Sequence, residues 1–295
     1  MRRLKRVAVV GVGLIGGSFA AALRRAGAVT TIVGVDRDSQ ALERAAALGV
    51  IDTAASSVSE ATKGAELVMV AVPVRSIGPV LHDVALALDA GAVVTDAGST
   101  KSEVARIARE ELRHLFPRFV PGHPIAGRET SGVDSASAEL FKGARVVLTP
   151  EADTARDAID LVRACWEAVG GRVATLDAAE HDYIFAAVSH LPHLLSFALA
   201  SEIASRPNAA ELLGFAAGGF RSFTRIAASS PEMWRDIALQ NREALLAELD
   251  RYDARLAVFR ELIDKGDGPG LQRLMAEAHA SRQALGPVRR SPSSE

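Results

Sequence analysis

The stretch that decides the fold lies near the start of the chain and reads Arg6-Val7-Ala8-Val9-Val10-Gly11-Val12-Gly13-Leu14-Ile15-Gly16. A short apolar run ends there in a glycine-rich turn, and Phe19 to Ala26 predicts a helix directly afterwards. The three glycines fit G-x-G-x-x-G, which is a weak pattern alone but is typical of dinucleotide binding between a strand and a helix.

Each glycine of this turn has a separate reason to be glycine. Gly11 permits a tight turn, Gly13 lets the backbone approach a pyrophosphate, and Gly16 lets the helix pack closely on the strand. The N–H groups that begin the helix, at Leu14 and Ile15, would face the phosphates. We therefore predict a nucleotide site here. The alternative is a glycine turn in an α/β protein that binds no nucleotide.

A carboxylate follows the second predicted strand, where such sites bind ribose. Asp36 ends the strand Thr31–Val35 and lies about 20 residues after Gly16. A carboxylate accepts hydrogen bonds from ribose hydroxyls and repels a 2′-phosphate, so it favours NAD over NADP. Arg37 opposes this preference in part, because an arginine can stack on adenine or pair with a phosphate.

Strands and helices alternate over residues 1–176. The strand candidates are continuous apolar runs, which imply a parallel sheet covered by helices on both faces; they are residues 6–10, 31–35, 67–72, 92–95, 118–120, 145–148 and 172–176. After Asp177, Ala, Leu, Glu and Arg dominate and the strand-like runs disappear. We predict an α/β domain over 1–176, an all-helical domain over 177–286 and a frayed tail over 287–295.

Composition excludes several classes of protein. The 295 residues are 48% hydrophobic and 24% charged, with a formal net charge of −2, which argues against a dedicated nucleic-acid or membrane-surface binder. The single cysteine, Cys165, excludes an intramolecular disulfide and fits a reducing compartment. No apolar run reaches the roughly 18–20 residues that span a bilayer. The basic start followed by an uncharged stretch imitates a signal peptide, but its glycines weaken a hydrophobic helix, and we expect a cytoplasmic protein.

A helical seam occurs late in the chain. Its apolar residues recur at alternating steps of four and three, on one helix face; they are Leu245, Leu249, Tyr252, Leu256, Phe259 and Ile263. The seam indicates either packing inside a helical bundle or a subunit interface, and the sequence leaves both open.

Two further loops should line the cofactor cleft, because ligands of such sheets bind beyond the carboxyl ends of the strands. Val72 and Pro73 follow the third long strand, and Asp96 to Lys101 follow the fourth. Ser99 could cap the next helix, with Thr100 or Ser102 as rival caps, or it could contact substrate.

Histidines stand out in both halves. His123 lies between a glycine and a proline in a predicted loop that follows a strand, and its imidazole can take a proton near neutral pH. His190 and His193 share a helix face, with Pro192 between them to start or kink that helix. A zinc pair would lack a third clustered ligand, so we expect no metal; capping or core packing is the other alternative.

The helical half also carries two arginines four residues apart, Arg221 and Arg225, among glycines and aromatic residues. A guanidinium grips a carboxylate through two parallel hydrogen bonds, and the alternative is a solvated surface pair. Farther on, Ser230 followed by Pro231 suits a helix start, and Ser229 and Glu232 are also spaced as a capping box. Trp234 predicts packing.

Taken together, these motifs resemble those of the prephenate dehydrogenase family, over nearly the whole chain and in the same order. The resemblance is carried by the glycine turn with Gly17-Ser18, Asp96-x-Gly98-Ser99-x-Lys101, His123-Pro124-Ile125-Ala126-Gly127, Ser189-His190-Leu191-Pro192-His193, and Phe223-Thr224-Arg225-Ile226-Ala227 with Trp234. It implies a Rossmann-type domain joined to an all-helical dimerisation domain, and hence a homodimer. It also implies NAD-dependent oxidative decarboxylation of prephenate or arogenate, small molecules of tyrosine synthesis.

The resemblance further implies roles for individual residues. His123 would take the proton of the ring hydroxyl, and Ser99 would hydrogen-bond near that hydroxyl and the nicotinamide. His193 would line the substrate pocket, and Arg225 would hold a substrate carboxylate. Arg128 departs from the usual small polar residue of the family and could reach a carboxylate or pair with Glu129, which leaves the substrate preference open.

Two other functions remain possible on the sequence. One is a two-domain dehydrogenase of β-hydroxyacid type, in which a lysine is the acid/base; Lys101 is the candidate. The other is a regulatory protein that binds NAD without turnover, which would not need His123, His193 and Arg225 to converge.

Overall fold

The computed structural model describes residues 2–128 and 130–286. Its contacts divide the chain into two compact units between Leu245 and Leu246. The predicted domain boundary at residue 176 stays a prediction, and the predicted tail, residues 287–295, lies outside the described residues.

A six-stranded parallel sheet forms the centre of the first unit, with strand order β3-β2-β1-β4-β5-β6. Its strands are β1 (Leu4–Val10), β2 (Val29–Val35), β3 (Thr53–Ala54), β4 (Leu67–Val70), β5 (Val93–Asp96) and β6 (Phe119–Val120). In the register, Val7 of β1 lies beside Ile32 on one side and Leu67 on the other. The basic, apolar start of the chain is therefore an interior strand.

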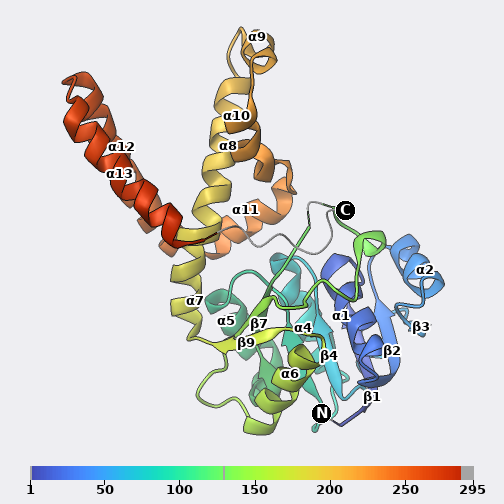
Figure 1. The fold of residues 1–295 in the computed structure, drawn as a ribbon. Coiled ribbons are helices and arrows are strands. Elements are labelled where there is room, and N and C mark those ends of the chain that lie inside the picture. The colour runs from blue at the N-terminus through green and yellow to red at the C-terminus, as the bar shows by residue number, and fades with distance from the viewer. Residues whose placement is uncertain (1, 129, 287–295) are drawn as a thin grey trace. The chain divides into compact units, whose positions relative to one another are not determined.

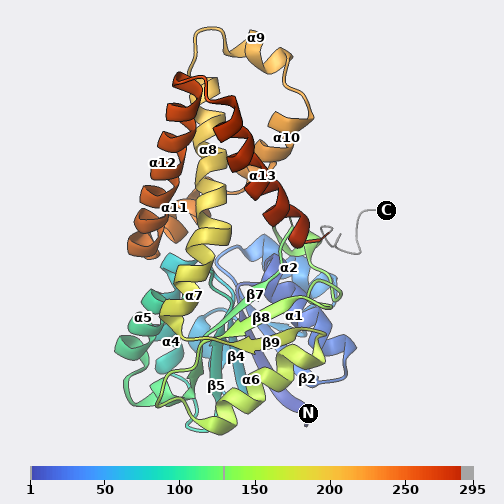
Figure 2. The ribbon, with the colours of Figure 1, turned by 60° about the vertical axis from the view of Figure 1, so that its left-hand side comes forward.

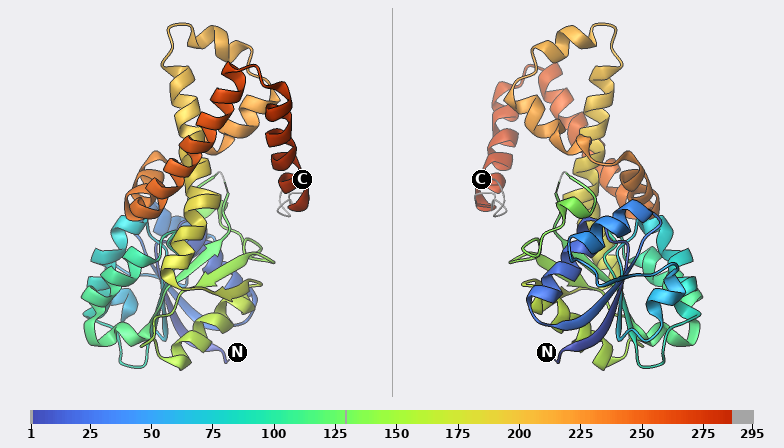
Figure 3. Two further views of the ribbon diagram at one scale, coloured as in Figure 1. Left: turned by 90° about the vertical axis from the view of Figure 1, so that its left-hand side faces the viewer. Right: turned by 90° about the vertical axis from the view of Figure 1, so that its right-hand side faces the viewer.

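Helices cover both faces of this sheet, as the apolar strands predict (Figures 1 and 3). Val7 and Val9 pack in the layer of α1 (Leu14–Arg25), α2 (Ser39–Ala47) and α6 (Arg156–Ala168). Ala8 and Val10 point the other way, into the layer of α3 (Val58–Thr62), α4 (Ile77–Ala85) and α5 (Ser102–Leu112). Successive residues of one strand thus serve two cores.

A second, three-stranded sheet corrects the expectation of one parallel series. It consists of β7 (Gly122–Ile125), β8 (Arg145–Leu148) and β9 (Arg172–Thr175), and β7 runs antiparallel to β8. The chain leaves the first sheet at Pro121, which has no N–H for a ladder, and Gly122 donates its N–H to the Asp96 carboxylate instead, over 3.0 Å.

The rest of the first unit is helical. It contains α7 (Ala178–Phe185), α8 (Leu191–Ala204), α9 (Ala209–Gly214), α10 (Gly218–Thr224), α11 (Pro231–Gln240) and the start of α12 (Arg242–Asp264). A π-helical turn, Ala186–His190, joins α7 to α8 without a break, and Pro192 lies in the first turn of α8 (Figure 2).

This joined helix, Ala178–Ala204, corrects a second expectation. Among the described residues it is long and apolar enough to cross a membrane, with a mean hydropathy of 1.5. The sequence search missed it because polar residues interrupt every apolar run. Three of its polar side chains, His181, Asp182 and His190, are buried within the first unit, whereas only 28% of its most apolar 18-residue window is buried.

The second unit is a helical hairpin formed by the rest of α12 and by α13 (Gly268–Ala284). Asp267 caps α13 by accepting a hydrogen bond from the Gly270 N–H over 2.9 Å. The Asp267 N–H is donated to the Leu262 carbonyl at the end of α12 over 2.9 Å, which closes the turn.

Candidate active site

The glycine turn has the geometry that a pyrophosphate site requires. Gly11 has a φ of +90°, and a Cβ there would lie 2.4 Å from the Ala71 carbonyl oxygen. A Cβ at Gly16 would lie 2.0 Å from the Gly11 oxygen, whereas one at Gly13 would meet nothing within 4 Å. No side chain caps α1, so its first N–H groups, beside Leu14 and Ile15, remain available to an anion. These residues fit a dinucleotide.

Asp36 is half-buried beside this turn and holds it. One carboxylate oxygen accepts a hydrogen bond from the Val12 N–H over 2.9 Å, and the other accepts one from the Asp38 N–H over 3.1 Å. Each oxygen keeps a further lone pair for a ribose hydroxyl. Arg37 is exposed next to it.

Val72 and Pro73 follow β4 and are half-buried and exposed, respectively. A Cβ at Gly11 would lie 3.1 Å from a methyl group of Val72. The β4 loop is therefore in contact with the glycine turn, as its position after a parallel strand predicts.

Lys101 is completely buried and paired. Its Nζ donates to Asp96 Oδ2 over 2.5 Å and to the Gly122 carbonyl over 2.7 Å. Burial lowers the pKa of Lys101, and the charge of Asp96 opposes this shift. A lysine enclosed in this way holds the start of β7, and this placement disfavours the alternative in which Lys101 is the acid/base on substrate.

His123 is half-buried on β7, opposite Val147 of β8. It therefore lies on a strand and not in the loop that the sequence predicts. Its Nδ1 lies 2.8 Å from Nε2 of His181, and its ring packs on Phe185 with centroids 4.9 Å apart. Burial lowers the pKa of His123 well below 6.5, and the neighbouring charges of His181, Lys101 and His190 lower it further. His123 is thus neutral near pH 7 and able to accept a proton.

Sequence reasoning missed His181 and Asp182, which lie behind His123. Asp182 Oδ1 lies 2.8 Å from His181 Nδ1, and both residues are buried. Burial alone would raise the pKa of Asp182, but hydrogen bonds from His181 and from the Ser102 and Lys101 backbone N–H groups lower it below its usual value. The available signal was an adjacent histidine and aspartate in an apolar helical stretch.

The N-terminus of α5 is capped from another helix. Asp182 accepts hydrogen bonds from the N–H groups of Lys101 and Ser102, each over 2.8 Å. The three predicted caps are therefore wrong: no side chain of Ser99, Thr100 or Ser102 caps α5. The half-buried Ser99 hydroxyl makes no hydrogen bond to any residue that the structure describes, which leaves it available to a ligand. At α11 the cap is Ser230, directly before Pro231, which confirms the predicted helix start there, whereas the capping box from Ser229 is wrong.

His193 and His190 both pack against the predicted packing residue Trp234. The His193 ring stacks on Trp234 with centroids 3.6 Å apart. Its Nδ1–H donates to the Ser189 carbonyl over 2.8 Å. His190 is buried with Nδ1 3.0 Å from Nδ2 of Asn241. Burial lowers the pKa of His190 to about 4.

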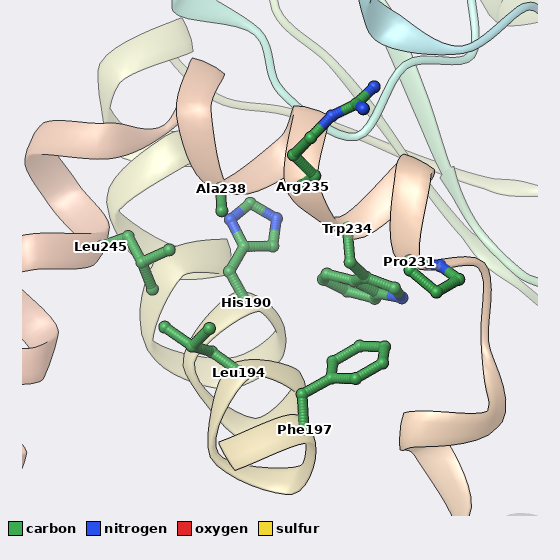
Figure 4. Close-up of a pocket in the computed structure, with 8 residues that line it drawn as sticks. All are labelled: His190, Leu194, Phe197, Pro231, Trp234, Arg235, Ala238 and Leu245. Atoms are coloured by element: carbon green, nitrogen blue, oxygen red, sulfur yellow. The ribbon is translucent and has the colours of Figure 1, made fainter. Parts of the chain in front are cut away.

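Figure 4 shows His190 and Trp234 in the wall of a cavity of about 200 Å³. Apart from His190 and Arg235, the side chains that line the cavity are apolar or aromatic. The described residues include no cluster of three or more His, Cys, Asp or Glu side chains that could hold a metal ion.

The predicted arginines lie in different settings. Arg225 is exposed at the start of the 3-10 turn that follows α10. Burial lowers the pKa of His193, and the charge of Arg225 lowers it further. Arg221 donates to the Ala216 carbonyl at the surface. Arg128 is exposed and donates to the Ser135 carbonyl over 3.4 Å.

Comparison with known families gives two matches that together span most of the chain. Residues 19–175 match the family model described as prephenate dehydrogenase, nucleotide-binding domain. Residues 177–277 match the model described as prephenate dehydrogenase, dimerization domain.

Individual proteins agree with these matches. The chain is 36% identical to cyclohexadienyl dehydrogenase of Zymomonas mobilis, over 97% of each sequence. A crystal structure of prephenate dehydrogenase from Aquifex aeolicus, in complex with hydroxyphenyl propionate and NAD+, has a TM-score of 0.89 and 37% identity over 95% of this chain and 98% of that one. The Synechocystis arogenate dehydrogenase structure has a TM-score of 0.80 and 32% identity over 95% of this chain and 99% of that one.

Proposed function

Because the chain belongs to the prephenate dehydrogenase family, we propose that it catalyses the NAD-dependent oxidative decarboxylation of prephenate, of arogenate, or of both, in tyrosine biosynthesis. The observation that carries the proposal is the half-buried, neutral imidazole of His123, which the buried Lys101–Asp96 pair fixes at the end of the nucleotide-binding sheet. The β-hydroxyacid and NAD-sensing alternatives give His123 no role.

The proposed reaction releases the ring carboxylate as CO₂ while the carbon that bears the hydroxyl loses a hydride. Bound NAD supplies the hydride acceptor. Prephenate then gives 4-hydroxyphenylpyruvate and arogenate gives tyrosine, and the ring becomes aromatic. The protein has to orient the substrate, accept the hydroxyl proton and neutralise carboxylates.

We assign these tasks to four residues. His123 accepts the hydroxyl proton, and Ser99, whose hydroxyl is not used as a helix cap, donates a hydrogen bond beside it. Arg225 holds a substrate carboxylate near His193, which lines the pocket while its ring is held flat against Trp234. Arg128 stays a proposed substrate contact, with its exposed guanidinium on the segment after β7.

The cofactor would be held by the glycine turn and by the loop after β4. Gly11, Gly13 and Gly16 would form the cradle for the pyrophosphate, together with the first turn of α1, and Val72 and Pro73 would lie beside it. Asp36 would bind the ribose hydroxyls and so favour NAD over NADP.

The assembly and location follow from the same family. We propose a homodimer formed through the helical domain, because residues 177–277 match a dimerisation domain. We also propose a cytoplasmic location. Neither a nucleic acid nor a membrane is needed for the proposed reaction.

The test is direct. The purified protein is mixed with NAD or NADP and with either prephenate or arogenate, and the absorbance of the reduced nicotinamide is followed. We expect reduction with NAD and at least one of the two acids, and slower reduction with NADP. Absence of reduction with both acids and both cofactors would refute the proposed function, and the ratio of kcat/KM values for the two acids would identify the preferred substrate.

A further inference from the structure

We propose that His181 and Asp182 form a positioning pair for His123, which fixes the tautomer of the His123 ring and stabilises that ring after it takes a proton. The proposal rests on the proposed function, since it assumes that His123 is the proton acceptor. It gives His181 a role, and it gives Asp182 a role in addition to capping α5.

The tautomers follow from the distances. Asp182, whose pKa is lowered, is an ionised carboxylate and can only accept, so His181 must donate from Nδ1 to Oδ1 over 2.8 Å. The neutral ring of His181 then has a lone pair on Nε2. That lone pair faces His123 Nδ1 at 2.8 Å, so His123 must donate there. The remaining nitrogen of His123, Nε2, is left as the acceptor.

The packing leaves these rings little freedom. Phe185, one turn after His181 on α7, contacts both imidazoles, with centroids 4.4 Å from His181 and 4.9 Å from His123. The His181 side chain is completely buried, and both of its nitrogens are used. Asp182 is in turn fixed by the backbone N–H groups of Lys101 and Ser102.

The surrounding charges explain why His123 needs this support. Burial disfavours a positive charge on His123, as does a positive charge on His181, Lys101 or His190. Burial also lowers the pKa of His181, although Asp182 and Asp96 oppose this shift, so His181 faces His123 as a neutral acceptor. A proton accepted by His123 is therefore stabilised through the hydrogen bond to His181, whose far side is bound to a carboxylate.

The first experiment compares two substitutions at His181. In His181→Leu the His123 ring loses the acceptor for its Nδ1–H. We expect kcat to fall about 10- to 100-fold, which is part of the 10²–10⁴-fold that a general base supplies. We expect KM to change less than about threefold. The acid limb of kcat/KM should move to lower pH. In His181→Gln the amide oxygen can accept from His123 and the amide nitrogen can donate to Asp182, so we expect at least a tenfold recovery of kcat over His181→Leu.

The matched control is His82→Gln, which removes an exposed histidine that pairs with Glu111 on the surface and should leave kcat unchanged. The pairing is refuted if His181→Leu keeps kcat within twofold of the unsubstituted enzyme with an unmoved acid limb. It is also refuted if His181→Gln is no more active than His181→Leu while both variants show the thermal unfolding of the unsubstituted protein.

A second measurement needs no turnover. Nitrogen-15 NMR of histidine-labelled protein, with His123 assigned from the spectrum of His123→Asn, should show the proton on Nδ1 of His123 at neutral pH. A proton on Nε2 instead would overturn the proposal. This measurement separates the positioning pair from the proposed function, because the tautomer of His123 can be determined even in a protein that reduces no NAD with either acid.

Discussion

The imidazole of His123 combines a fixed position on β7 with a pKa well below 6.5. We expect His123→Asn to lower kcat about 10²–10⁴-fold, because an amide cannot accept the hydroxyl proton. NAD affinity, measured by titration calorimetry, should be unchanged, since the cofactor residues are untouched. The lowered pKa also means that kcat/KM of the unsubstituted enzyme should stay level as pH falls through 6.5 and decline only at lower pH.

A variant that turns over substrate at a near-normal rate would remove His123 from the mechanism. A decline of kcat/KM that is centred above 6.5 would contradict the neutral, buried imidazole.

His190 should make the stability of the protein depend on pH. Its pKa is about 4 in the folded state and near 6.5 when unfolded, so the unfolded state binds more protons between these values. The free energy of unfolding should therefore fall as pH drops from 6.5 to 4, with about 3 kcal/mol from His190 alone. Urea titrations over this range should show a smaller decrease for His190→Gln, whereas His82→Gln should retain the full decrease.

At this scale, residues with a local signature could be predicted and residues defined by long-range contacts could not. Gly11, Gly13 and Gly16 are recognisable because strand, turn and helix are consecutive in the sequence. Asp182 is about 80 residues from the Lys101 and Ser102 N–H groups that it binds, and no spacing rule reports such a contact. The predicted roles of His123, Ser99 and Arg225 stay predictions until variants are measured.

The α5 helix shows how one element depends on another. Its first N–H groups are bound by Asp182 of α7, and no side chain of its own segment caps it. We expect Asp182→Ala to lower the free energy of unfolding by about 2–3 kcal/mol, because a cap is lost and buried N–H groups are left unpaired. Chemical denaturation measures this change.

The matched control for α5 is Ser102→Ala, which removes one of the side chains that the sequence suggests as a cap. Ser102→Ala should cost only a few tenths of a kcal/mol if Asp182 is the cap, and a larger loss than for Asp182→Ala would contradict the assignment.

Elements were predictable where hydrophobic periodicity was uninterrupted. The apolar runs that became β1, β2, β4 and β5 needed only composition and spacing to be identified as parallel strands. In the second sheet, β8 and β9 match predicted strands, but β7 could not be predicted, because it is four residues long, contains Pro124 and pairs with a strand about twenty residues away. Such a strand forms only because it pairs with β8, and its own sequence does not distinguish it from a loop.

Across the whole molecule, the helical seam has two kinds of surroundings. Leu245 is only 4% exposed within the first unit, whereas Leu256 and Ile263 are 47% and 66% exposed on α12. Packing inside the first unit accounts for Leu245, and the exposed part of the seam is where we predict a subunit interface. We expect the protein to sediment as a dimer and the double variant Leu256→Glu, Ile263→Glu to sediment as a monomer, because buried carboxylates at an interface are costly.

Sedimentation equilibrium decides this point. A monomer in the unsubstituted protein, or a double variant that stays dimeric, would contradict an interface at this face of α12. As a control, Leu86→Glu changes an equally large, 71% exposed side chain in the nucleotide-binding half and should leave the assembly unaltered.

The π-helical turn between α7 and α8 sets the phase between two groups of histidines. Each residue advances an α-helix by about 100°, so removal of Val188, which is 67% exposed and contributes little to packing, would convert the turn to ordinary α-helix and rotate α8 by that angle relative to α7 and to α11. His181 would keep its place against His123, while His193 would swing away from Trp234. The number of residues between His181 and His193 is therefore fixed by the contacts that each histidine makes with a different element.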